Sequence, residues 1–170
     1  MRVTLLAAII MTTACVLIAG APPGETKSSP AFEKLKSLVG TWKGKDEEGK
    51  PVTITYKVVS AGTTIMETLD MGENEAAMIT MYHPDGKKLM MTHYCSLGNQ
   101  PRMKASDLSK DGNTLSFNFV DISNRASAKD NYMHKLVFTF KDTDHFSQQW
   151  TMKMEGKMEH PSMFDYERVK

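Results

Sequence analysis

Residues 35–45 read LKSLVGTWKGK and predict a short helix that runs directly into the first strand of a β-barrel. Gly40 stands two residues before Trp42, and a glycine lets the backbone pass close to a large ring because it has no Cβ. We therefore expect the indole of Trp42 to plug one end of the barrel. A last strand over residues 163–168 brings Arg168 to this plug if the first strand pairs with the last, and a guanidinium over an indole contributes about 0.5–2 kcal/mol.

The start of the helix is marked by Ser29 and Pro30. A hydroxyl side chain caps the first turn of a helix, and proline fits the first helical position. Phe32, Leu35 and Leu38 follow at intervals of three residues and share one face. Because so short a helix is not stable alone, we expect it to pack on the barrel and close one end.

Apolar and polar residues alternate along most of the chain after residue 51, as is typical of half-buried strands. Short turn signals separate these segments, and no long helical pattern lies between them. The sequence thus predicts an all-β fold: a closed, antiparallel, up-and-down β-barrel of about ten strands, whose closure removes exposed edges. Besides the first strand, the expected segments are 52–58, 63–71, 76–83, 87–96, 101–106, 115–119, 134–140, 146–152 and 158–169. The longest irregular stretch, 122–132, is polar and is expected to be functional or mobile.

The N-terminal residues 1–21 have the pattern of an export signal, with Arg2 as the only charge, an apolar run and an A-x-A site at its end. Residues 22–29 form a linker, and 30–170 the barrel domain. A retained membrane anchor is disfavoured because the apolar run barely reaches the roughly 20 residues of a span. The expected location is therefore periplasmic or secreted, with membrane attachment only through lipidation at Cys15.

Cysteine and charge content narrow the classes of partner. After cleavage the remaining cysteine is Cys95, so no intramolecular disulfide can form. The whole chain has 21 basic and 20 acidic residues, and loss of Arg2 makes the exported domain formally neutral. This balance argues against nucleic acid and anionic membranes as partners, since both favour a basic excess.

The Gly40-x-Trp42 motif on the first strand, with Arg168 near the end of the last, resembles the calycin superfamily of lipocalins and fatty-acid-binding proteins. About ten strands is the number expected of a fatty-acid-binding or nitrobindin-like calycin rather than an eight-stranded lipocalin. Residues 92–103, THYCSLGNQPRM, look like the signature of uncharacterised bacterial lipocalin-like domains of unknown function. The resemblance implies a barrel that holds a small apolar ligand, and it brings no established activity.

The strongest candidate site is on residues 87–96, where Met91, His93 and Cys95 share one face with Leu89. If this face points inward, His93 needs a hydrogen-bond partner or a ligand, because an unsatisfied buried polar group costs about 1–3 kcal/mol. His93 is thus either a polar anchor in a pocket or satisfied by a neighbouring strand, and Cys95 is either part of that pocket or a small buried apolar residue. A Cys–His nucleophile pair is disfavoured, since side chains two apart on one strand lie about 6–7 Å from each other.

Three more residues are expected at the pocket. Gln148 shares a face with Trp150, and Arg102 follows the turn after His93, where it would hold a ligand carboxylate. The fourteen methionines either line an adaptable cavity or simply fill the barrel. The first functional hypothesis is therefore an exported protein that binds a small hydrophobic or amphipathic molecule.

The alternative is a haem protein or an enzyme that uses an inward histidine, because the nitrobindin branch of calycins binds haem through a histidine. None of the five histidines lies at a tight ligand spacing, so no metal site is predicted. His93 and His134 are the best candidates, whereas His83 and His145 are expected in solvent. The sequence favours a binding protein over an enzyme without deciding between them. A third hypothesis makes the barrel a scaffold whose loops, 122–132 above all, contact a partner protein.

Overall fold

The computed structural model describes residues 28–73, 75–155 and 158–170. The expected signal peptide and most of the expected linker lie outside these residues, so export stays a prediction. In the described part, no helix is both long enough and apolar enough to cross a membrane. The helices and strands are α1 (Pro30–Lys36), β1 (Gly40–Lys45), β2 (Pro51–Val59), η1 (Ser60–Gly62), β3 (Thr64–Asp70), β4 (Met78–Asp85), β5 (Lys88–Tyr94), β6 (Gln100–Ala105), β7 (Thr114–Ser123), β8 (Tyr132–Phe140), β9 (His145–Met154) and β10 (Met158–Arg168).

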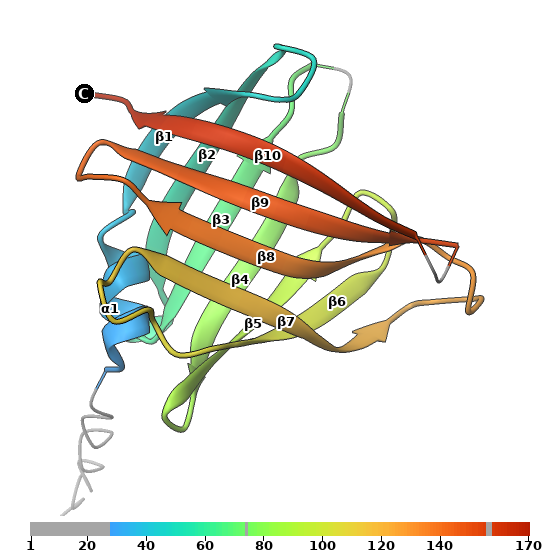
Figure 1. Cartoon of the computed structure of the whole chain (residues 1–170), viewed down its shortest axis with the longest axis horizontal. Coiled ribbons are helices and arrows are strands. Elements are labelled where there is room, and N and C mark those ends of the chain that lie inside the picture. The colour runs from blue at the N-terminus through green and yellow to red at the C-terminus, as the bar shows by residue number, and fades with distance from the viewer. Residues whose placement is uncertain (1–27, 74, 156–157) are drawn as a thin grey trace, which may run out of the picture.

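The ten strands form one closed barrel, as predicted (Figure 1). Each strand pairs antiparallel with the next along the chain, and β1 closes the ring by pairing with β10. The expected irregular stretch 122–132 is shorter than predicted, because β7 continues to Ser123 and β8 begins at Tyr132. The fold class is therefore confirmed.

The seam between β1 and β10 contains the expected stack of Arg168 on Trp42. These residues face each other in the register, and the guanidinium carbon lies 4.0 Å from the centre of the indole ring. The guanidinium also donates to the carbonyl oxygens of Val39, at 3.0 Å, and Ser37, at 2.8 Å. Gly40 has a φ of +126°, which favours glycine, and a Cβ there would lie 3.4 Å from the guanidinium of Arg168. The glycine thus makes room for Arg168 rather than for the indole itself.

A second glycine, Gly44, allows β10 to lie close to β1. A Cβ on Gly44 would lie 2.4 Å from the backbone oxygen of Asp165 and 2.8 Å from the ring of Tyr166. Such distances force the backbone apart, so β10 can approach β1 here only because residue 44 has no side chain.

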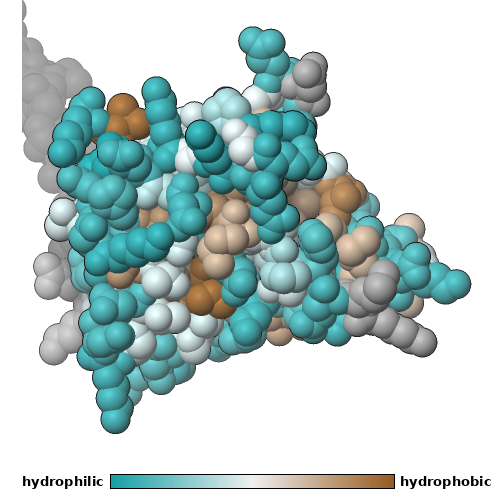
Figure 2. Space-filling model, turned by 45° about the horizontal axis from the view of Figure 1, so that its top comes forward, coloured by the Kyte–Doolittle hydropathy of each residue, from teal (hydrophilic) through white to brown (hydrophobic). Residues whose placement is uncertain are grey.

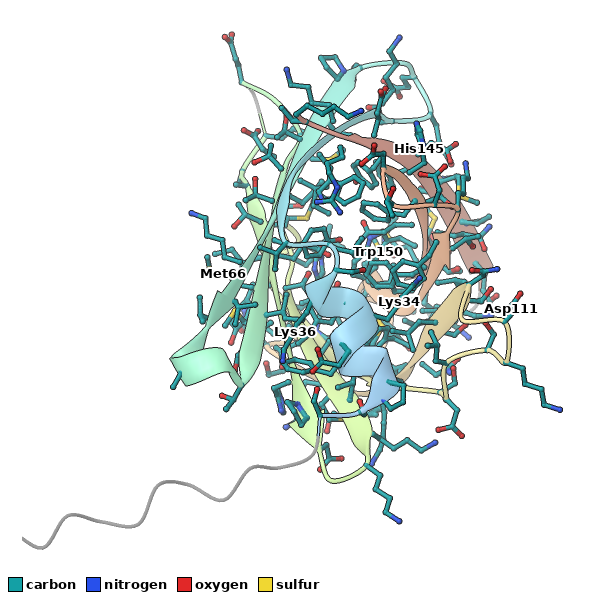
Figure 3. The ribbon with its side chains drawn as sticks, turned by 90° about the vertical axis from the view of Figure 1, so that its left-hand side faces the viewer. Lys34, Lys36, Met66, Asp111, His145 and Trp150 are labelled. Carbon is teal, nitrogen blue, oxygen red and sulfur yellow. The ribbon has the colours of Figure 1, made fainter. Side chains whose placement is uncertain are left out.

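Helix α1 closes one end of the barrel (Figures 1 and 3). Ser29 caps it, since its hydroxyl accepts a hydrogen bond from the backbone N–H of Phe32. Phe32, Leu35 and Leu38 are buried against the core, as their spacing predicted. The indole N–H of Trp42 donates to the Leu38 carbonyl oxygen at 2.7 Å, which fixes the helix to the barrel.

Aromatic rings fill the half of the barrel next to α1. The ring of Trp42 meets that of Phe146 edge-on at 4.7 Å between centres. Tyr82 lies 5.5 Å from Phe117 and 6.1 Å from Phe138, again between ring centres. This half of the interior is therefore a packed core, of the kind found in any globular domain.

The methionines divide between the two faces of the sheet. Met91 and Met103 are fully buried in the interior. Met66 lies between the inward residues Ile65 and Glu67 and so faces outward on β3, as Figure 3 shows. On the face drawn in Figure 2, apolar residues are scattered among hydrophilic ones. Only part of the methionine set is therefore in a position to line an interior site.

Candidate functional site

The interior contains a buried carboxylate, Glu67 on β3, in the middle of an inward face that is otherwise apolar. Ile65 and Leu69 are its inward neighbours on the strand, and Glu67 is 0% exposed. Among the described residues Glu67 has no ion pair. A buried charge without a cation is costly unless it is well hydrogen-bonded.

Hydrogen bonds from two walls of the barrel satisfy this carboxylate. The Tyr82 hydroxyl and the Gln148 side-chain amide donate to Oε2 at 2.8 and 2.9 Å. The Thr80 hydroxyl donates to Oε1 at 3.1 Å. Gln148 Nε2 also donates to the Tyr56 hydroxyl at 2.9 Å. Because Gln148 is on β9 and the others are on β2 to β4, these bonds tie facing walls together across the interior.

His93 extends the cluster toward the end of the barrel away from α1. Its side chain is on β5, is 2% exposed, and has Nδ1 2.9 Å from the Thr80 hydroxyl. The imidazole lies against the Trp150 indole, with 4.6 Å between ring centres. The indole N–H in turn donates to Gln148 Oε1 at 3.3 Å. We call the connected set the Glu67 network: Tyr56, Glu67, Thr80, Tyr82, His93, Gln148 and Trp150.

Burial sets the protonation behaviour of the network. It raises the pKa of the Glu67 carboxyl, while the hydrogen bonds from its neighbours act in the opposite direction. Burial, with the adjacent charge of Glu67, raises the pKa of the Tyr56 and Tyr82 phenols well above the ordinary value, so both keep their protons. Burial lowers the pKa of His93 to about 4. The imidazole is therefore neutral at pH 7.

Half-buried methionines lie beyond the network, at the end of the barrel opposite α1. Met152 follows Trp150 on the inward face of β9 and pairs with Met133 on β8. Met78 begins β4 and pairs with Leu69. Figure 3 shows Trp150 inside the ring of strands, behind α1. The network thus separates the packed aromatic core from an end that is lined by flexible thioethers.

The structure brings together three of the predicted site residues, His93, Gln148 and Trp150. Met91 is on the same inward face of β5 as His93 and is fully buried. Cys95 is buried just after β5, and burial raises the pKa of its thiol. An inert, buried thiol is the expected behaviour of such a group.

Arg102 does not join them. Pro101 and Met103 point inward on β6, so Arg102 points outward, where its guanidinium forms a two-pronged ion pair with Asp121 on β7. The expectation that Arg102 holds a carboxylate inside the barrel is therefore corrected, because the side-chain alternation of β6 puts it on the other face of the sheet.

This placement gives a first prediction. Replacing Arg102 with alanine is expected to change stability by less than about 1 kcal/mol, because exposed ion pairs contribute little. Binding of a ligand in the interior should change less than about twofold, because the side chain is on the outside. Urea denaturation and a titration with the neutral dye Nile red measure the two effects. A large loss of binding in this variant would return Arg102 to the site.

Glu67, Thr80, Tyr82 and Tyr56 are members of the network that the sequence did not single out. A signal for Glu67 was present, since it is a charged residue in the alternation Ile65-x-Glu67-x-Leu69. A carboxylate on the apolar face of a strand indicates a buried polar site. The partners carry no comparable signal, because threonine and tyrosine are common on strands.

The remaining histidines lie outside the network. His134 is at an irregularity of β8, with Nε2 3.4 Å from the carboxylate of Glu159. His83 and His145 are exposed, as expected. Among the described residues, no group of three or more His, Cys, Asp or Glu side chains is arranged to hold a metal ion.

Two surface grooves lie away from the network. One, of about 850 Å³, is on β1, β10 and the turn before β9. The other, of about 580 Å³, is between α1 and the turns at the closed end. Both are lined by side chains of opposite charge, among them Lys43, Glu167, Lys141, Asp142, Lys34 and Asp111. Neither has the apolar lining with a few converging polar groups that a small-molecule site needs.

Comparison with known proteins supports the fold. No family model matches the chain, and no curated protein matches it. A protein of unknown function from the DUF3598 family of Nostoc punctiforme aligns with 79% of this chain at 12% identity and a TM-score of 0.51, and the chain spans about half, 49%, of that protein. Rv2717c from M. tuberculosis aligns over 84% of this chain and 99% of its own length, at 16% identity and a TM-score of 0.55. At such identities the likeness shows the barrel fold alone.

Proposed function

We propose that the barrel binds a small, mainly apolar molecule in the half of its interior opposite α1, with the Glu67 network as the polar floor of the site. The ligand would lie against His93 and Trp150 and be surrounded by the methionines at that end. With this function goes the proposal that the chain is an exported calycin, supported by its sequence pattern and by the stack of Arg168 on Trp42.

The observation that carries the proposal is the state of His93. The imidazole is almost wholly buried and is held at Nδ1 by Thr80, yet Nε2 has no hydrogen-bond partner among the described residues. His93 Nε2 is not one of the fully buried side-chain atoms that lack a partner in the described residues, so a molecule in the site could reach it and would gain a hydrogen bond of about 0.5–1.5 kcal/mol. His93 is thus a converging polar group of the kind that orients a ligand in a mostly apolar site.

Stability alone does not account for the network. Replacing buried charged groups with well-packed apolar ones is often neutral or stabilising. A barrel that served only as a scaffold could hold apolar residues in place of Glu67 and its donors without losing stability. The retention of a carboxylate, two phenols, an amide and an imidazole in one place supports a binding role.

The test is a titration of the exported domain with Nile red, together with native mass spectrometry of the purified protein. We expect saturable binding of one dye molecule and a copurifying small molecule that denaturation releases. Met152→Trp, at the proposed entrance, should weaken dye binding at least tenfold, whereas Met66→Trp, the same exchange on the outer face, should not. Absence of both dye binding and a copurified molecule would reject the proposal.

The geometry of His93 also favours a second candidate, haem. Histidines that bind metals usually hold their other ring nitrogen in a hydrogen bond, as Thr80 holds Nδ1 here. Because the imidazole is neutral at pH 7, Nε2 of His93 is the atom that would hold the haem iron. When bound, haem would supply the redox and ligand-binding chemistry of its iron.

Haemin titration decides this candidate. A shifted Soret band that disappears in His93→Ala and persists in His134→Ala would support haem binding. An unshifted band in the unmodified protein would exclude it.

A further inference from the structure

We infer that the chain of hydrogen bonds Glu67–Thr80–His93 selects a ligand whose polar end donates a hydrogen bond, such as an alcohol or a phenol, against one that ends in a carboxylate. The inference rests on the proposed function and deepens it. It follows from where the proton lies in each hydrogen bond of this chain and of its neighbours.

Glu67 accepts hydrogen bonds from its neighbours in the network. The Gln148 nitrogen can only donate, and the Tyr82 phenol keeps its proton, so Oε2 of Glu67 accepts from both. The orientation of the Gln148 amide is fixed by the Trp150 N–H, which donates to its oxygen. Surrounded by donors, Glu67 is an acceptor, and the single proton of the Thr80 hydroxyl goes to Oε1.

The orientation of the Thr80 hydroxyl decides which ring nitrogen of His93 carries the proton. With its proton directed at Glu67, the Thr80 oxygen can only accept from His93 Nδ1, 2.9 Å away. A neutral imidazole carries one proton, so the proton is on Nδ1 and the lone pair is on Nε2. The network therefore presents an acceptor to whatever lies next to Nε2.

An acceptor at this position discriminates between ligand ends. A ligand hydroxyl group donates a hydrogen bond to Nε2. A carboxylate or an ester places oxygen lone pairs against the lone pair of Nε2, so neither the ligand oxygen nor Nε2 has a hydrogen bond. Neither Arg102, which is on the outside, nor Arg168, which is bound to carbonyl oxygens at the α1 end, offers a cation to the interior. We expect a preference of roughly tenfold to 100-fold for the donor.

Glu67→Gln is expected to reverse the direction of the hydrogen bonds that run from residue 67 through Thr80 to His93. Its amide oxygen would take the place of Oε2 and accept from Tyr82 and Gln148, and its NH₂ would donate to Thr80. The Thr80 proton would then point at Nδ1 and the imidazole proton would move to Nε2. This variant should favour the carboxylate. Thr80→Val leaves Glu67 in place and removes the link, so it should reduce the preference.

The test uses three ligands with the same alkyl chain: dodecanol, methyl dodecanoate and dodecanoate. Their affinities are measured at pH 7 by displacement of Nile red from the exported domain. In the unmodified protein dodecanol should bind at least about tenfold more tightly than methyl dodecanoate or dodecanoate, whose polar ends only accept hydrogen bonds. In Glu67→Gln the ratio of dodecanol to dodecanoate should fall at least about tenfold.

The imidazole ¹⁵N shifts of His93 give a readout that needs no ligand. They should show the Nδ1–H form in the unmodified protein, and the Nε2–H form in Glu67→Gln if circular dichroism shows that this variant folds. Equal binding of the three ligands, or the Nε2–H form in the unmodified protein, overturns the inference and leaves the proposed function standing. Failure of Nile red to bind, with no copurified molecule, rejects the proposed function and the inference with it.

Discussion

Replacing Trp42 with alanine is expected to lower the free energy of unfolding by about 3–5 kcal/mol, the usual cost of deleting a large buried aromatic side chain. The indole is 1% exposed and packs against Phe146. It also supports Arg168 from β10 and fixes α1 through the Leu38 carbonyl oxygen. The substitution therefore removes packing at the point where the first strand, the last strand and the helix meet.

Urea denaturation followed by circular dichroism measures this loss, since the signal does not depend on tryptophan. Trp42→Phe keeps a ring against Phe146 but loses the N–H, so its loss should be smaller. Val120→Ala, at an exposed apolar side chain, serves as the control and should stay within about 0.5 kcal/mol of the unmodified protein. A Trp42→Ala protein within about 1 kcal/mol of the original would show that the seam is not a main source of stability.

The second large effect is a dependence of stability on pH that comes from His93. Burial lowers the pKa of His93 from an ordinary 6.5 to about 4 in the folded protein. Between these values the unfolded chain binds a proton that the folded protein does not. Stability is therefore retained above about pH 6.5 and lost as the pH falls toward 4, by about 2–3 kcal/mol between pH 7 and about pH 4.5.

His93→Gln removes this titration, so its stability should fall less than that of the unmodified protein over the same interval. Urea midpoints at the two pH values give the difference. The raised pKa of Glu67 changes stability in the opposite direction, because the stability that it contributes at low pH is lost as the pH rises. Glu67 is present in both proteins, so its contribution does not distinguish them. His83→Gln, at an exposed histidine, should leave the dependence unchanged. Equal slopes for His93→Gln and the unmodified protein would contradict the burial of a neutral imidazole.

Side-chain alternation along each strand shows which of the predicted site residues the sequence pattern could place in the interior. The apolar set on β5 is long enough to fix its inward face, and His93 is found there as expected. β6 alternates just as clearly, with Pro101 and Met103 inward, so its pattern already places Arg102 outside; the prediction of Arg102 at the pocket rested on its position after the turn instead. Gln148 and Trp150 were predicted to share a face, and that face meets His93 across the interior. This contact joins strands that are far apart in sequence.

By itself, the sequence determined a closed antiparallel barrel of ten strands, a helix that begins at Ser29 and Pro30, and the meeting of Trp42 with Arg168. These follow from local patterns: the period of two, turn residues, a cap and a glycine. Only the tertiary structure decided that Glu67 is the centre of the interior site, because its donors come from β4 and from β9 on the facing wall. Hydrogen bonds between such distant residues depend on the closure and register of the whole sheet, which no local pattern specifies.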